Sequence, residues 1–288
     1  MTMTVVKTGP RTVLKDAGRP GHAEYGVAES GPVDRAAYAA ANRLVGNAAG
    51  AAVLECLLGG LVVRFDGPAV VALTGTDAQL QIDGTQVAAG SAVTVPAGAL
   101  VEVTIPRHGL RSYFAVAGGF AVAPVLGSRS TDALGGVGPP VPQEGDVLPI
   151  GTAAGDGHPV PLGKPGDGPI VATVDLGPRD DWFAPETVAT FLTAEYTVAP
   201  ASDSVGVRLS GPALPRSRTG ELPSEGVVRG GVQIPPDGQP IVFAADHPLT
   251  GGYPVIAVVH PADTDRLGQA RPGQTVRFAL ATDFLEYP

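Results

Sequence analysis

The chain has 288 residues, of which 44% are hydrophobic and 16% are charged, and this composition excludes an intrinsically disordered protein. The formal net charge is −9 at pH 7, so we expect no nucleic-acid-binding surface. Gly (40) and Pro (29) are frequent without a collagen repeat, which indicates a β-rich protein with many turns.

The single cysteine, Cys56, cannot form a disulfide within the chain, which is typical of a protein from a reducing compartment. We expect its thiol to be buried as a small apolar group. No apolar run reaches the roughly 18 residues that a membrane-spanning helix needs. The N-terminal stretch lacks the charged-then-apolar order of a signal peptide. The sequence therefore predicts a cytoplasmic protein.

The first clear helix is expected over about residues 33–46. In "SGPVDRAAYAAANRLVGN", apolar side chains recur at helical spacing and form one continuous stripe. Ser30 is a candidate N-cap, with Pro32 in the first turn. Because the stripe is mostly alanine, we expect the helix to lie close against a sheet, with Tyr38 and Asn42 pointing another way.

Strand patterns dominate the region after this helix. Asp83-Gly84 separates two alternating apolar runs, which is a strong signal for a two-residue hairpin turn. Pro96-Ala-Gly98 is a second turn signal. Short strands with turns roughly every 8–12 residues predict an antiparallel barrel or sandwich.

Residues 151–169, "GTAAGDGHPVPLGKPGDGP", contain ten glycines and prolines without any periodicity, so we expect a linker there. This predicts an N-terminal β-rich domain over 1–150, which carries the helix, and a C-terminal β-barrel domain over 170–288. Short helical turns are expected near Pro185–Phe191 and Asp263–Leu267. The predicted fold class is all-β with a minor helix and two barrel-like domains.

Common cofactor motifs are absent from the sequence. "PLGKPGDG" has a Gly-Lys pair but lacks the other positions of a phosphate loop, and no dinucleotide-binding glycine pattern opens a helix. Cys-x-x-Cys and His-x-x-x-His are missing, so no metal ligand set is visible. No lysine has the Met-Lys-Met setting of a biotin attachment site. If ATP or biotin matters, another chain therefore carries it or helps to bind it.

Polar side chains concentrate at turns. Ser or Asp before a Pro-led helix is usually a cap, and Arg beside Asp in a loop is usually a local ion pair. The residues that we expect to support a site or a turn are Asp16, Arg19, Ser30, Asp34, Arg208, Glu225 and Gln233.

The loop "LGSRSTD" is richer in hydrogen-bond donors than the other turns. Hydroxyls, backbone amides and one guanidinium in a short loop suit a bound carboxylate or phosphate, and the donors here are Ser128, Arg129 and Ser130. A purely structural role for this loop stays equally open.

The stretch "AADHPLTGGYPVIAVV" places Asp246 and His247 before a Gly-Gly-Tyr-Pro turn. Gly251 and Gly252 would allow a positive-φ corner between two buried strands. An acid beside a histidine could also carry protons in catalysis. The residues by themselves leave both interpretations open.

Seven motifs follow one another along nearly the whole chain. They are "GPRTVLKDAGRPGHAEYGVAESGPVDRAAYAAANRLVGNAAGAAVLE", "RSYFAVAGGF", "LGSRSTD", "GPRDDWF", "SDSVGVRLSG", "GGVQIPPDGQPIVFAADHPLTGGYPVIAVV" and "RPGQTVRF". Together they resemble the biotin-dependent carboxyltransferase, or allophanate hydrolase subunit 2, family. Its members include the C subunit of 5-oxoprolinase, Kip-type antagonists of a sporulation kinase inhibitor and part of urea carboxylase.

The resemblance implies two cyclophilin-like β domains and an active site shared with a subunit 1 homologue, which corresponds to the B subunit of 5-oxoprolinase. In the 5-oxoprolinase version, a third protein, which hydrolyses the lactam, completes an ATP-driven opening of 5-oxoproline to glutamate. We expect this version, in which the chain is a hydrolase subunit that is inactive alone. The alternatives are the carboxyltransferase half of a biotin-dependent urea or amide carboxylase and a non-catalytic regulatory module of the Kip type.

The resemblance also suggests roles for individual residues. Asp246 and His247 are the expected catalytic residues, because they could handle protons. The expected substrate-binding residues, with the arginine as a carboxylate partner, are Ser128, Arg129, Ser130, Gly251, Gly252 and Tyr253.

The chain departs from the family at several positions. Relatives often have Gln-Thr-Thr between an Asp-Arg or Asp-His pair and the Gly-Gly, where this chain has Pro248, Leu249 and Thr250. They also often have glutamine in place of His22. If that first glutamine contacts substrate in relatives, this chain lacks the contact.

Overall fold

The structure is a computed structural model that describes residues 1–281, except 88, 89, 162 and 164. The last seven residues of the predicted C-terminal domain lie outside the described residues. The chain forms two compact units. The first comprises Met1–Gly21 and Glu29–Gly166, and the second comprises His22–Ala28 and the residues from Asp167 onward. The linker and domain boundaries predicted around 151–169 stay a prediction.

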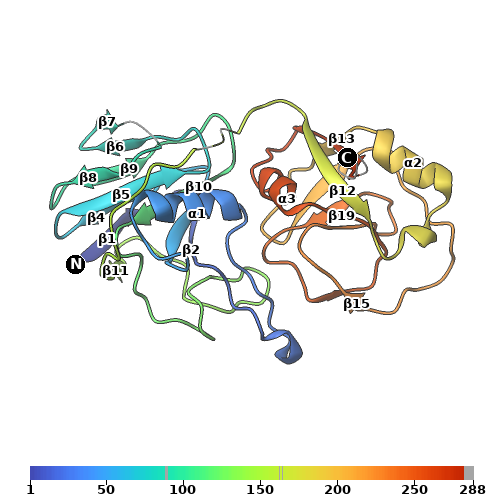
Figure 1. The fold of residues 1–288 in the computed structure, drawn as a ribbon, viewed down its shortest axis with the longest axis horizontal. Coiled ribbons are helices and arrows are strands. Elements are labelled where there is room, and N and C mark those ends of the chain that lie inside the picture. The colour runs from blue at the N-terminus through green and yellow to red at the C-terminus, as the bar shows by residue number, and fades with distance from the viewer. Residues whose placement is uncertain (88–89, 162, 164, 282–288) are drawn as a thin grey trace, which may run out of the picture. The chain divides into compact units, whose positions relative to one another are not determined.

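Two antiparallel sheets build the first unit (Figure 1). The six-stranded sheet has the order β11 (Val147–Pro149), β1 (Thr2–Lys7), β4 (Val62–Phe65), β9 (Leu100–Val103), β6 (Leu80–Ile82) and β7 (Thr85–Val87). The five-stranded sheet has the order β2 (Arg11–Lys15), β3 (Val53–Leu57), β10 (Arg111–Val116), β5 (Ala69–Thr74) and β8 (Val93–Val95). The chain passes from one sheet to the other between β8 and β9, at the predicted Pro96–Gly98 turn.

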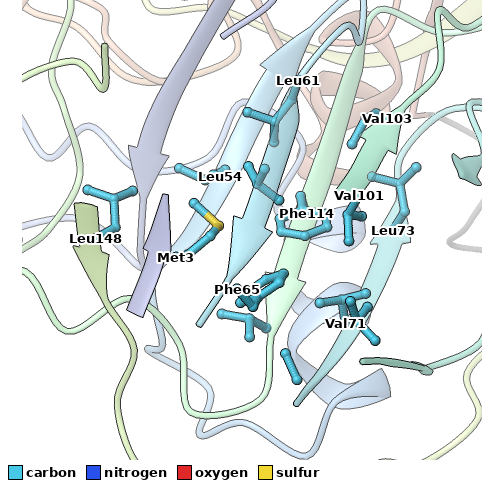
Figure 2. Close-up of a cluster of buried hydrophobic side chains, with 14 of the residues drawn as sticks. Met3, Leu54, Leu61, Phe65, Val71, Leu73, Val101, Val103, Phe114 and Leu148 are labelled. Carbon is cyan, nitrogen blue, oxygen red and sulfur yellow. The ribbon is translucent and has the colours of Figure 1, made fainter. Parts of the chain in front are cut away.

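Side chains from both sheets form the main core of this unit, and Figure 2 shows them gathered in one cluster. Phe65 and Val101 come from the six-stranded sheet, whereas Leu54, Val71 and Phe114 come from the five-stranded sheet, and all five are 0% exposed. Burying one such side chain stabilises the fold by about 1.5–3 kcal/mol. The alternation of apolar residues along each strand therefore fixes which face of each sheet turns inward.

Helix α1 (Arg35–Leu44) packs against β5 and β10 on the other face of the five-stranded sheet (Figure 1). All six residues of β10 are buried because the strand is covered on both faces. Phe114 belongs to the main core, whereas Tyr113 and Ala115 belong to the cluster that α1 forms. Small side chains such as Ala41 allow the close approach that the alanine stripe predicted.

The N-cap of α1 is Asp34, and the prediction of Ser30 was wrong. Asp34 Oδ1 accepts a hydrogen bond from Ala37 N at 2.8 Å, as a capping side chain does. Ser30 has a φ of 56°, which is left-handed rather than the extended conformation of an N-cap. Pro32 precedes the helix instead of lying in its first turn. The helix is therefore shorter than the predicted 33–46.

The prediction that Tyr38 and Asn42 point away from the packed face was also wrong. Their exposed fractions are 5% and 2%. Tyr38 Oη and Asn42 Nδ2 each donate a hydrogen bond to Ala51 O at 2.9 Å. Their polar ends are satisfied inside the fold, so these two side chains tie α1 to the loop before β3.

The second unit contains a closed barrel of seven strands. Their order is β12 (Ile170–Leu176), β19 (Val255–Val259), β16 (Gly231–Gln233), β17 (Ile241–Phe243), β14 (Gly206–Ser210), β13 (Tyr196–Val198) and β20 (Thr275–Leu280). β20 closes the barrel by pairing in parallel with β12, whereas the other described pairs are antiparallel. The rings of Phe191 and Phe278 stack at 4.4 Å in its core.

Two short helices cover this barrel, where the sequence predicted helical turns. α2 (Pro185–Thr193) packs against β20, and α3 (Pro261–Leu267) packs against β12. The smaller elements are the 3₁₀ helices η1 (Ala23–Tyr25) and η2 (Asp180–Trp182) and the two-stranded pair β15 (Glu225–Gly226) and β18 (Thr250–Gly251).

These elements confirm the predicted all-β fold class with a minor helix. Asp83 and Gly84 form the predicted hairpin turn between β6 and β7, with φ of 47° and 77°. Cys56 is buried, as expected. No helix among the described residues has the length and apolar character to cross a membrane.

Candidate functional site

The carboxylate of Asp16, just after β2, organises the hydroxyl-rich loop of the first unit. It is 4% exposed and accepts hydrogen bonds from the hydroxyls of Ser128 and Ser130 and from the backbone amide of Arg129. Gly18 N donates to the same carboxylate at 2.9 Å. The loop therefore binds an anion, and that anion is a side chain of the chain itself.

This arrangement bears on the three predicted substrate-binding residues of the loop. Ser128 and Ser130 are 0% exposed, and both hydroxyls are used by Asp16. Arg129 is half-buried, and its Nε donates to Val122 O at 2.7 Å. Their role in binding substrate stays a prediction, and of the three only the guanidinium of Arg129 is partly exposed.

Two further cations lie beside this loop. Lys15 Nζ donates to Thr131 O at 2.8 Å and to Ser30 Oγ at 3.2 Å. Arg19 is 2% exposed, and its Nη2 donates to Ser130 O. The structure thus brings Asp16, Arg19 and Ser30 together with the loop, and their role in supporting a site stays a prediction.

Asp34 belongs to a neighbouring network that joins α1 to the five-stranded sheet. Asp34 N donates to Tyr113 Oη at 2.7 Å, and Tyr113 Oη donates to Glu55 Oε2 at 2.8 Å. Burial, together with the negative charges of Glu55 and Asp34, raises the pKa of Tyr113 well above its usual value. This network holds the helix start in place.

The loop between β17 and β19 in the second unit carries the predicted catalytic pair. Asp246 is 1% exposed, and its backbone amide donates to Ser204 O at 2.8 Å. His247 is half-buried, and its Nδ1 lies 2.7 Å from Pro248 O. A carbonyl oxygen only accepts hydrogen bonds, so Nδ1 must carry a proton.

This contact fixes how His247 can act. When the ring is neutral, the lone pair resides on Nε2, which makes no hydrogen bond to any described residue. The Phe243 ring lies 5.8 Å from the imidazole, centroid to centroid, and packs against it. Nε2 of His247 is therefore an oriented proton acceptor, and His247 as a residue is better exposed than Asp246.

The Gly-Gly-Tyr corner is built on Gln233. Gln233 is 6% exposed, and its Nε2 donates to Tyr253 O at 3.1 Å. A Cβ on Gly251 would lie 2.5 Å from this Nε2, so any larger residue there would force the amide of Gln233 to move. The expected positive φ is wrong, because neither Gly251 nor Gly252 has one. Close packing, not backbone conformation, explains Gly251.

An ion pair braces this corner from the side. β15 pairs with β18 so that Glu225 lies opposite Gly251. Arg179 binds both carboxylate oxygens of Glu225, with Nε to Oε2 at 2.9 Å. These hydrogen bonds lower the pKa of Glu225. The contacts therefore bring Glu225 and Gln233, the two residues expected to support a site, next to Gly251 and Tyr253.

Arg208 and Arg216 differ from what the sequence suggested. Arg208 on β14 has an exposed side chain that makes no hydrogen bond to a described residue. Sequence reasoning missed Arg216, whose guanidinium lies 5.5 Å from the centre of the Tyr253 ring. No local motif marks Arg216, because it reaches Tyr253 only through the folding of the barrel.

Comparison with known proteins places these residues in a family context. The family model described as "Carboxyltransferase domain, subdomain A and B" matches residues 25–280. The 5-oxoprolinase C subunit of Escherichia coli (strain K12) is 37% identical over 279 residues, which cover 96% of this chain and 90% of that protein. The 5-oxoprolinase C subunit of Haemophilus influenzae is 32% identical, covering 93% and 87%.

A solved structure gives the same picture at the level of the fold. The urea amidolyase of K. lactis matches with a TM-score of 0.91 at 28% identity. The match covers 96% of this chain and 18% of that one. The likeness thus spans both units here but one region of the larger protein.

Proposed function

The chain belongs to the carboxyltransferase domain, subdomain A and B, family, and from this premise we propose that it is a subunit of an ATP-dependent 5-oxoprolinase complex. In this proposal the complex opens 5-oxoproline to glutamate, and the active site is shared with a subunit 1 partner, the B subunit of such a complex. A third protein, which hydrolyses the lactam, completes the assembly. The chain alone is inactive.

The observation that carries this proposal is the extent of the match to the C subunit of 5-oxoprolinase. At 37% identity the alignment covers 90% of the E. coli protein and runs through both units of this chain. The loop with His247 and the Gly-Gly-Tyr corner lies inside that aligned region. The aligned region therefore contains both sets of predicted site residues.

The chemistry of the lactam defines what the site must do. The C–N bond of an unactivated amide breaks, water supplies the new oxygen, and the leaving nitrogen takes up a proton. In our proposal His247 accepts the proton from water at Nε2 and returns it to that nitrogen. Its Nδ1 stays bonded to Pro248 O, so the ring keeps its orientation. Asp246 supports the loop from within the fold.

ATP fits the residues of the hydroxyl-rich loop poorly. A triphosphate needs converging backbone amides and cations. In this loop the amide of Arg129 is bonded to Asp16 and the amide of Ser130 is bonded to Ser128 Oγ. We therefore assign the binding of ATP to the partner subunits and derive no step through it.

Reconstitution tests the proposal. The chain would be mixed with its subunit 1 partner and the third protein, and glutamate release from 5-oxoproline would be measured with and without ATP. We expect ATP-dependent release that is absent when any one protein is omitted. The proposal would be contradicted if the complex is shown to be assembled and releases no more glutamate than the partner-free control.

The match to urea amidolyase supports a second candidate. The chain could be the carboxyltransferase half of a biotin-dependent urea or amide carboxylase, with biotin carried by another chain. The same reconstitution separates the two. In that version, a biotin carboxylase with its biotinylated carrier replaces the third protein, and urea replaces 5-oxoproline. The second candidate then predicts that carboxylated urea is formed. Assembly without either activity would favour the Kip-type regulatory role.

A further inference from the structure

The arginines of the second unit are mostly neutralised by carboxylates. Five of them form ion pairs, namely Arg179 with Glu225, Arg218 with Asp181, Arg229 with Asp265, Arg266 with Asp263 and Arg277 with Glu195. Arg216 is half-buried and has no carboxylate partner among the described residues. A positive charge therefore stays uncompensated beside the Gly-Gly-Tyr corner.

The fold holds Arg216 firmly in this place. Its backbone forms a β-bridge with Phe183, and the next residue, Ser217, donates from its amide to Trp182 O at 2.8 Å. Arg216 Nη2 donates to Ile234 O at 2.7 Å, at the end of β16. The guanidinium is thus fixed between the barrel and the ring of Tyr253.

The guanidinium is incompletely satisfied. Nε is buried and has no hydrogen-bond acceptor, and Nη1 makes no hydrogen bond to a described residue. An arginine usually saturates its planar set of donors, and a partly desolvated guanidinium without an acceptor is unfavourable. Stacking on Tyr253 orients the group but supplies no acceptor. The missing partner is therefore an anion or an ordered water.

The corner beside Arg216 is not filled by a side chain at Gly252. Gly252 has no side chain, and a Cβ added there would meet nothing closer than Leu222 O at 3.6 Å. Tyr253 offers a half-exposed ring of 44% exposure as an apolar wall. Glu225, which lies opposite Gly251, is bonded to Arg179, and Asp181 is bonded to Arg218. The charges of these two carboxylates are therefore compensated, whereas the charge of Arg216 is left for a bound carboxylate.

We propose that Arg216 binds the carboxylate of the substrate, with the Tyr253 ring alongside the lactam. This inference rests on the proposed function, and it deepens it by choosing an acid substrate over urea, which has no carboxylate. It also moves the expected carboxylate partner away from the hydroxyl-rich loop. In that loop the hydroxyls expected to help bind the carboxylate are already bonded to Asp16.

Binding to the assembled complex without ATP tests the inference directly. Isothermal titration would compare 5-oxo-L-proline with 2-pyrrolidinone, the same lactam without its carboxylate. We expect 5-oxo-L-proline to bind more tightly to the unmodified complex. In Arg216→Gln its dissociation constant should rise about 10- to 100-fold, because a hydrogen bond to a charged group is lost. Binding of 2-pyrrolidinone should not change.

Two further variants control for structural damage. Arg218→Gln removes an exposed arginine two residues away that is paired with Asp181, and it should bind 5-oxo-L-proline as the unmodified complex does. Arg216→Lys keeps the charge but loses the planar fork of donors. Its affinity for 5-oxo-L-proline should therefore lie between that of Arg216→Gln and that of the unmodified complex. An unchanged dissociation constant in Arg216→Gln, or equal affinity for the two lactams in the unmodified complex, would overturn the inference.

Turnover separates this inference from the proposed function. With ATP present, Arg216→Gln should raise the KM for 5-oxoproline by the same factor. If glutamate is released normally and neither KM nor the dissociation constant changes, the inference is wrong and the function stands. If 5-oxo-L-proline binds in an Arg216-dependent manner but no glutamate is released, the inference stands and the proposed function is wrong.

Discussion

Single buried side chains decide how the polar loops of this chain behave. Asp16 accepts hydrogen bonds from two hydroxyls and two backbone amides. One of the amides belongs to Gly18 in its own turn, and the other three donors belong to residues 128–130, more than one hundred positions along the chain. His247 shows the opposite arrangement, because one ring nitrogen is bonded and the other is left open. The first pattern belongs to a structural anchor and the second to a group that can exchange protons.

Removing the charge of Asp16 should weaken the first unit. Asp16→Asn replaces one acceptor oxygen by an amide group that faces the donors of the loop, so we expect the free energy of unfolding to fall by about 3 kcal/mol. Urea unfolding would measure this change. The matched control is Asp237→Asn, an exposed turn residue that accepts from Gln239 N, and it should have little effect. Equal stability of both variants would contradict the anchor role.

The proton-transfer role of His247 predicts a loss of activity without a loss of stability. His247→Asn can still donate to Pro248 O but has no basic nitrogen, so kcat of the reconstituted complex should fall about 100-fold. His158→Asn, at an exposed histidine of the first unit, is the control and should retain full activity. A kcat for His247→Asn within threefold of the control would remove the assignment.

At the scale of elements, two very short strands, β15 and β18, help to position the Gly-Gly-Tyr corner of the second unit. β15 and β18 have two residues each, yet they set Glu225 opposite Gly251. The ion pair with Arg179 holds β15, and Gln233 on β16 holds Tyr253. The corner is therefore fixed both by the backbone pairing of β15 with β18 and by side chains from several elements.

Two neighbouring glycines should respond differently to the same substitution. Gly251→Ala places a Cβ 2.5 Å from Gln233 Nε2, so the amide must move and its bond to Tyr253 O is strained. We expect a destabilisation of about 1–3 kcal/mol. Gly252→Ala meets no atom closer than 3.6 Å and should cost much less. Urea unfolding followed by Trp182 fluorescence measures both, and equal effects would refute the packing explanation.

The Arg179–Glu225 pair should act on stability in a pH-dependent way. Hydrogen bonding to Arg179 lowers the pKa of Glu225 below its ordinary value of 4.5. The pair therefore contributes above that value, and its contribution is lost as the pH falls through the lowered pKa. The difference in urea midpoint between the unmodified chain and Glu225→Gln should shrink on acidification. A difference that stays constant or grows would speak against the pair.

For the whole molecule, the main fact is that each unit has its own core. The two clusters of the first unit contain no residue of the barrel, and the barrel cluster contains no residue of the first unit. Each unit also carries its own reporter. Cys56 is 0% exposed in the first core, and burial raises the pKa of its thiol to about 12. Trp182 belongs to the barrel cluster.

Separate cores predict separate responses to a core mutation. Val71→Ala leaves a cavity in the first core and should lower its stability by about 2–4 kcal/mol. In urea, the midpoint for Cys56 modification by a thiol reagent should then fall, whereas the midpoint for Trp182 fluorescence should stay. The control is Val174→Ala in the barrel, for which the two midpoints should respond in the reverse order. If both probes always shift together, the units unfold as one.

The sequence by itself determined the features that depend on neighbours along the chain. The strand alternation, the Asp83-Gly84 turn and the alanine-rich helix were predictable, because backbone geometry and side-chain period act over a few residues. The ordered motifs also identified the family, which the comparisons confirm. Ser30 was mistaken for the helix cap because its left-handed φ cannot be read from the residue pattern.

Only the tertiary structure decided which polar groups are already partnered. It placed Asp16 in the hydroxyl-rich loop, buried Tyr38 and Asn42 against Ala51, and set Gln233 against Gly251. It also brought Arg216 to Tyr253 without a carboxylate partner among the described residues. Hydrogen bonding and burial depend on residues that are far apart in the sequence, so whether a donor is occupied or open to a ligand is fixed only when the chain folds.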